Sequence, residues 1–102
     1  MKMLIFSVFD AAVNAYLQPF FVRSKGEAIR SFQDAVNDPK SQFNIHYTDY
    51  SLFLLGSYDD ASGVFDTNIP ERVTGARDVI VEDGASASTT WEPDRPVKIG
   101  QR

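Results

Sequence analysis

Five stretches of the chain have hydrophobic patterns that bear on β-structure. Residues 3–9 are apolar except for one serine, which is typical of a central strand covered on both faces. Alternation sorts its side chains into two sets, Met3, Ile5 and Phe9 on one side and Leu4, Phe6 and Val8 on the other. Residues 16–23 form a second, aromatic-rich run. Its Pro19 has no amide donor, so it indicates a sheet edge or a bulge.

The second half of the chain supplies the remaining strands. Residues 50–58 predict a third strand, in which Gly56 marks a bulge or a close approach of two backbones. A polar loop at 59–63 leads into a fourth strand at 64–69 with one wet face. Residues 78–82 have weaker strand character and predict an additional edge strand. Residues 40–49 show no period and are expected to form a connecting loop.

A single amphipathic helix is predicted from Ser24 to Val36. Ser24 and Glu27 have the spacing of a capping box, in which each side chain bonds a free backbone amide of the first turn. The apolar residues fall on one stripe of a 3.6-residue period, which must lie on the sheet: Ala28, Ile29, Phe32, Ala35 and Val36. Asn37 is expected to be a left-handed cap, and Pro39 prevents the helix from continuing.

Together these elements predict an α+β fold with the order ββαββ. It is a mainly antiparallel sheet of about four strands with one amphipathic helix packed on one face. The chain has 102 residues, enough for one domain, expected at 1–84. Residues 85–102 are small, polar and proline-bearing, and a flexible tail is expected there. An open sheet with one helix leaves apolar surface uncovered, which favours a homodimer.

Charge and composition exclude several classes of function. The net charge of −4 disfavours avid non-specific binding to duplex DNA, and no apolar run is long enough to span a membrane. The apolar run near the amino terminus is only seven residues long, so a cytosolic location is a better inference than secretion. There is no cysteine and His46 is the only histidine, so no zinc set, cofactor motif or catalytic triad is predicted. We expect a protein that is not an enzyme.

One group of residues is a candidate nucleic-acid contact, where the aromatic strand meets the start of the helix. Exposed rings can stack on bases, and basic residues can contact phosphates; this candidate strip comprises Tyr16, Phe20, Phe21, Arg23, Lys25 and Arg30. In the alternative interpretation Phe20 and Phe21 are packing residues, one on each face of the sheet. Trp91 either fills an apolar gap or anchors a partner, because tryptophan is enriched at interface hot spots.

The order of these features resembles the small non-structural protein of gokushovirus-type microviruses, which are single-stranded DNA phages. The resemblance covers about residues 1–66 and lies in five segments: 3–10, 16–21, 26–32, 34–39 and 49–60. It implies a protein that is absent from the capsid and acts in the host cytoplasm during the switch to single-strand genome synthesis. The implied partner is single-stranded DNA or the replication machinery. The alternative is a module that captures a host or phage protein through the sheet face or Trp91.

Overall fold

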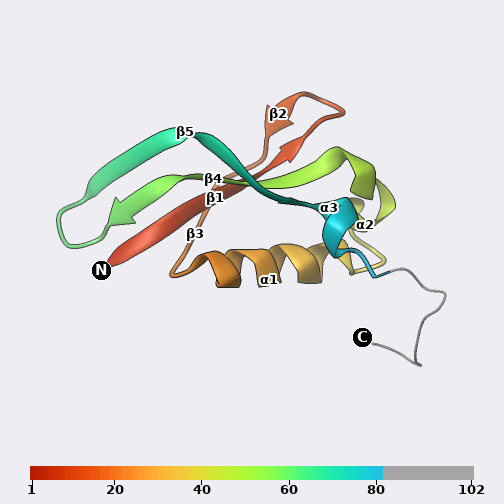
Figure 1. The fold of residues 1–102 in the computed structure, drawn as a ribbon, viewed down its shortest axis with the longest axis horizontal. Coiled ribbons are helices and arrows are strands. Elements are labelled where there is room, and N and C mark those ends of the chain that lie inside the picture. The colour runs from red at the N-terminus through yellow and green to blue at the C-terminus, as the bar shows by residue number, and fades with distance from the viewer. Residues whose placement is uncertain (82–102) are drawn as a thin grey trace.

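In the computed structural model, which describes residues 1–81, an antiparallel sheet is covered on one face by the main helix (Figure 1). The predicted tail and Trp91 lie outside the described residues. The elements in chain order are β1 (Lys2–Asp10), β2 (Ala15–Tyr16), β3 (Phe20–Val22), α1 (Lys25–Val36), α2 (Gln42–Ile45), the 3-10 helix η1 (Tyr47–Asp49), β4 (Tyr50–Asp59), β5 (Val64–Gly75) and α3 (Ala76–Val79). The predicted α+β class is confirmed.

Strand β1 is the centre of the sheet. It pairs with β4 along one edge and with both β2 and β3 along the other, and β5 pairs with the far side of β4. Every pairing is antiparallel, because each strand returns beside its neighbour through a short connection or through the α1 layer. Residues 3–9 therefore form the predicted central strand.

The predicted aromatic strand is interrupted at Pro19. Phe9 pairs with Tyr16 but Phe6 pairs with Phe20, so the register shifts by one residue between the two halves. The interruption is anchored by Leu17, whose amide donates to the Val8 carbonyl at 2.8 Å and whose carbonyl accepts from the Ser7 hydroxyl at 2.6 Å. Pro19 thus lies at a bulge in an edge strand, as its missing donor predicts.

Strands β4 and β5 form a long hairpin with two irregularities. Gly56 has a positive φ of 156°, and a β-carbon there would collide with the carbonyl oxygen of Asp66 on β5, which confirms the predicted close approach. Beyond it the register jumps from Gly56–Thr67 to Leu54–Glu71. The residues between, including Pro70, bulge out of the ladder, so β5 continues to Gly75 without an amide from proline.

Because β5 continues to Gly75 and leads into a helix, the prediction of an edge strand at residues 78–82 is wrong. Residues 78–82 were expected to form an edge strand, but Ala76–Val79 are the helix α3, and Ile80 and Val81 are irregular. Ile80 and Val79 pack against the hydrophobic core instead of joining the sheet. The three consecutive apolar residues, 79–81, are too few to distinguish a strand from one helical turn.

Helix α1 forms as predicted and closes one face of the sheet. Ser24 Oγ accepts from the Glu27 amide at 3.2 Å, while the Glu27 carboxylate accepts from the Arg23 amide, one residue before the expected Ser24. Ala28, Phe32 and Val36 are buried against the strands. The core they form includes Phe6 and Leu52, both fully buried.

The carboxyl end of α1 differs from the prediction. Asn37 has φ −90° and ψ 2°, so it is not a left-handed cap. Side chains satisfy the free carbonyls of the last turn: Asn37 donates to Gln33, and Asn44 donates to Val36 at 3.0 Å. The segment expected as a loop at 40–49 contains α2, capped by Ser41, and η1. Both are shorter than the four or more turns that a helical period needs to be visible.

Candidate functional site

The face of the sheet opposite α1 carries two clusters of aromatic side chains. The first, called the Phe53 cluster, contains Phe9, Tyr16 and Phe53, with ring centroids 4.9 to 6.0 Å apart. The second, called the Tyr58 cluster, contains Phe21, Tyr58 and Phe65, at 4.8 to 6.3 Å. Each cluster draws its rings from three strands, because directly paired and diagonal residues of an antiparallel sheet lie within aromatic reach.

Three of these six rings are exposed to solvent, whereas Phe9, Phe53 and Tyr58 are half-buried. Tyr16 is 43% exposed, Phe21 is 42% exposed and Phe65 is 57% exposed. Between the clusters Ile5 and Ser7 are buried on this same side of β1, although no helix within residues 1–81 packs over them. The interpretation of residues 3–9 as a central strand buried on both faces is therefore confirmed, and the single helix α1 lies on the other side of the sheet from this aromatic surface, as predicted. We call this surface the open face.

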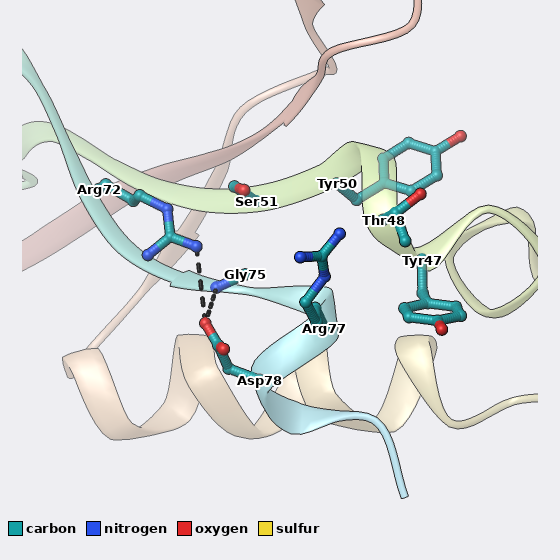
Figure 2. Close-up of a pocket in the computed structure, with 8 residues that line it drawn as sticks. All are labelled: Tyr47, Thr48, Tyr50, Ser51, Arg72, Gly75, Arg77 and Asp78. Atoms are coloured by element: carbon teal, nitrogen blue, oxygen red, sulfur yellow. Dashed lines mark hydrogen bonds and ion pairs between the residues drawn. The ribbon is translucent and has the colours of Figure 1, made fainter. Parts of the chain in front are cut away.

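A polar pocket of about 320 Å³ adjoins the open face where β5 runs into α3 (Figure 2). Arg72 and Gly75 contribute from β5 and Arg77 and Asp78 from α3, opposite a polar wall at residues 47–51. Ser51 is the register partner of Phe9, and Arg72 is the register partner of Phe53. The pocket is therefore continuous with the Phe53 cluster.

The arginine on β5 is held in place by its neighbours. Arg72 Nη2 lies 3.5 Å from Asp78 Oδ2, and the same oxygen accepts from the Gly75 amide at 3.3 Å. A β-carbon on Gly75 would lie 2.5 Å from Arg72 Nη2, so a larger residue there would require the flexible guanidinium to shift. Arg77 extends from α3 toward β4, beside this pair (Figure 2). Within residues 1–81 no carboxylate lies within 4.0 Å of its guanidinium.

Tyr50 forms the inner end of the pocket wall and is only 9% exposed. Burial raises the pKa of its phenol above the ordinary 10.0, and the nearby carboxylates of Asp10 and Asp49 raise it further. The hydroxyl therefore stays neutral throughout the physiological range. It can donate a hydrogen bond but supplies no charge.

The structure divides the predicted strip between two sides of the molecule. Tyr16 and Phe21 lie on the open face, in different clusters. Phe20 lies on the opposite side, where it packs against the core and its ring stacks with Phe6 at 6.2 Å. The interpretation that places Phe20 and Phe21 on opposite faces is the one that the geometry supports.

The three cations of the strip are exposed but lie at or on the helix layer. Arg23 precedes the α1 cap, Lys25 is the first residue of α1, and Arg30 lies in its second turn, off the buried stripe. Arg23 follows Phe21 by two residues, whereas Lys25 and Arg30 belong to α1. The residues that do join the predicted rings are Phe9, Phe53, Tyr58, Phe65, Arg72 and Arg77.

Three of these residues had a signal in the sequence. Phe53 alternates with Leu52 and Leu54, and Tyr58 and Phe65 flank the predicted hairpin loop. What the sequence did not contain was the pairing register, which decides which rings meet. The two arginines could not be grouped, because Arg77 was assigned to no element and Arg72 was not expected on β5.

The described part of the chain contains no helix long and apolar enough to cross a membrane. Within the same residues, no three histidine or carboxylate side chains gather where they could hold a metal ion. The fold and the surface together define a small α+β protein whose distinguishing feature is an aromatic, uncovered sheet face with an arginine-lined pocket beside it.

Comparison with known proteins places this chain in a family. The family model described as Phage ORF5 protein matches residues 3–79, which is more than half of the chain. The chain therefore belongs to the Phage ORF5 protein family and is a phage protein. A search of curated proteins found no match. A search of solved structures found none either.

Proposed function

We propose that this phage protein binds single-stranded DNA on its open face and acts without catalysis in viral genome replication in the host cytoplasm. The sequence resemblance to gokushovirus-type microviruses supports the step at which double-stranded replication switches to single-strand synthesis. The observation that carries the proposal is the pair of exposed aromatic clusters on a face that no helix covers.

The clusters suit a single strand better than a duplex. Unpaired bases can stack on exposed rings, each stack contributing about 1–3 kcal/mol, whereas bases within a duplex already stack on one another. The chain carries a net charge of −4, so long-range attraction to phosphates is weak and stacking must supply most of the affinity. Arg72 and Arg77 provide positive charge directly beside the Phe53 cluster.

The test is fluorescence anisotropy with a labelled oligothymidine and the full chain. Phe53→Leu removes a central ring of the open face while keeping an apolar side chain. We expect it to weaken binding by at least about fivefold, which corresponds to the loss of about 1 kcal/mol, the lower end of the range for one stacked base. The matched control is Phe43→Leu, because Phe43 lies on the helix side, against Phe32 and Tyr50. Absence of wild-type binding at about 50 mM salt would refute the proposal.

A second function is favoured by one observation on the hairpin. Val64, Phe65 and Ile69 of β5 are 59%, 57% and 89% exposed, a larger apolar surface than a free edge strand usually presents. This surface would suit a protein partner or a second copy of the chain. Pull-down from host lysate after nuclease treatment distinguishes the two functions: a partner that is retained by wild type and lost with Ile69→Asp supports protein capture.

A further inference from the structure

We infer that the pocket between β5 and α3 binds a phosphate group of the DNA strand that lies on the open face. This inference rests on the proposed function for the source of the phosphate, but the pocket's chemistry stands on its own. The two guanidinium groups of Arg72 and Arg77 line one side, and the residues facing them include Thr48 and Ser51, which carry hydroxyls (Figure 2). Guanidinium and hydroxyl donors are the groups that bind phosphate oxygens in proteins.

The charge in the pocket has the sign that a phosphate needs. Two arginines face one carboxylate, Asp78, so the lining is net positive in a chain that carries −4 overall. The contrast matters because a local positive site in a negative surrounding attracts an anion only when the anion enters the pocket itself. A strand sliding over the rest of the surface would be repelled.

The two arginines differ in their carboxylate neighbours, and therefore in how they would contact a phosphate. Arg72 lies 3.5 Å from Asp78 and its side chain is more than half exposed, so its guanidinium can reach a phosphate that enters the pocket. Arg77 has no carboxylate partner within residues 1–81, so its fork of donors is available for a bidentate contact. Asp78 competes with any phosphate for Arg72 and therefore limits the affinity.

The pocket also lies at the right place for a nucleotide. Ser51 and Arg72 are the cross-strand partners of Phe9 and Phe53, and directly paired residues have β-carbons about 4.5–5.5 Å apart. A base stacked on the Phe53 cluster thus has its own or the adjacent phosphate beside the arginines. This arrangement sets the register of the strand on the open face.

The test compares two variants with opposite expected effects on oligothymidine binding. Arg77→Gln should weaken binding by about tenfold, the lower end of a charge-assisted hydrogen bond. It should also reduce the slope of log affinity against log salt by about 0.7, the value for one phosphate on a single strand. Asp78→Asn keeps an acceptor for the Gly75 amide but removes the competing charge, and should strengthen binding. If Arg77 and Asp78 had a purely structural role, both variants would weaken oligothymidine binding or neither would.

The charge-matched control is Lys2→Gln, which removes one positive charge at the opposite end of β1, where Lys2 pairs with Asp59. It should leave the salt slope unchanged. If wild type binds oligothymidine and Arg77→Gln behaves like Lys2→Gln, the phosphate site is wrong while the proposed function stands.

A titration with inorganic phosphate detects the opposite case, in which the pocket binds phosphate although the protein does not bind DNA. Titrated into the labelled full chain, it should shift the backbone NMR signals of Ser51, Gly75 and Arg77 in wild type and much less in Arg77→Gln. Such shifts without any oligonucleotide binding would refute the proposed function and retain a phosphate site. No shift and no effect of either variant would overturn the inference.

Discussion

The two faces of the sheet are made by the same strands, but their side chains differ in how they are covered. On the helix side Phe6 and Leu52 are fully buried beneath α1 and form a continuous core with Val36. On the open face Phe53, one residue further along β4, meets only other rings of the sheet. Ile5 and Ser7 of the open face are buried as well, so the middle of β1 is buried on both sides, while the core cluster with Phe6, Leu52 and Val36 forms on the helix side.

The kind of apolar residue follows this division. In β4 the helix side uses leucines at 52 and 54, which interdigitate with α1, whereas the open face uses an aromatic residue at 53. A ring can shield neighbouring backbone while leaving much of its own surface in water, and it offers a flat surface to a ligand. The open face thus stays folded without a second layer and keeps binding surface available.

The largest expected difference between the faces is in stability. Leu52→Ala leaves a cavity in a closed core and should lower the free energy of unfolding by about 2–5 kcal/mol. Phe53→Ala removes ring contacts on the open face and should cost only about 1–2 kcal/mol. Urea unfolding followed by circular dichroism measures both. Equal losses would show that the open face is packed as tightly as the core, and the comparison would fail.

A second substitution tests what holds the open face in shape. Gly56 lies on β4 opposite Ile5, and a β-carbon there meets the Asp66 carbonyl of β5, so Gly56→Ala must push the hairpin apart or strain the backbone. We expect a loss of about 1–3 kcal/mol. The control is Gly26→Ala in α1, where nothing lies within 4 Å, and a gain of about 0.4–1 kcal/mol is expected. If Gly56→Ala and Gly26→Ala change the free energy of unfolding in the same direction, the close approach at Gly56 does not hold the open face in shape.

Much of the helix side could be predicted from the sequence, because its signals are local. The Ser24 cap and the stripe at Ala28, Phe32 and Val36 depend on spacing within one helix, and the structure reproduces them. Pro19 and Gly56 were also interpreted correctly, since a missing donor and a missing β-carbon have direct geometric consequences.

The open face could not be predicted, because it depends on register. Phe9, Phe53 and Tyr16 become neighbours through the registers that pair Phe9 with Tyr16 and Ser7 with Phe53, and sequence spacing fixes neither exactly. The predicted strip grouped residues near one another in the chain, and the alternation of a strand sent Phe20 and Phe21 to opposite sides. Arg77 came to the pocket only because β5 extends past Pro70.

The helix side is closed at one end by polar contacts, and these give a smaller test. The Asn37 amide donates to the carbonyls of Gln33 and Val79 at 2.9 and 3.1 Å, and its Oδ1 accepts from the Val81 amide at 2.7 Å. Asn37→Ala should cost about 1–2 kcal/mol in urea unfolding, because it removes three hydrogen bonds, of which the one to Val79 is partly buried. Asn68→Ala, on the exposed bulge of β5, is the matched amide and should cost about 0.5 kcal/mol or less. A greater loss at Asn68 would contradict this view of the helix side.

The smallest expected effect is a pH dependence of stability that comes from Tyr50, a residue of the helix side. Tyr50 points to the helix side, where burial, with Asp10 and Asp49 adding to it, raises the pKa of its phenol in the folded chain above 10.0. Below 10.0 both the folded and the unfolded chain hold this proton, and the stabilisation is fully present. As the pH rises past 10.0 the unfolded chain loses the proton first, so unfolding becomes easier until the folded pKa is passed. The urea midpoint of wild type should therefore fall more between about pH 8 and about pH 11 than that of Tyr50→Phe. Parallel curves for the two proteins would mean that the phenol of Tyr50 is as well solvated as in the unfolded chain, and that this end of the covered face is open to water.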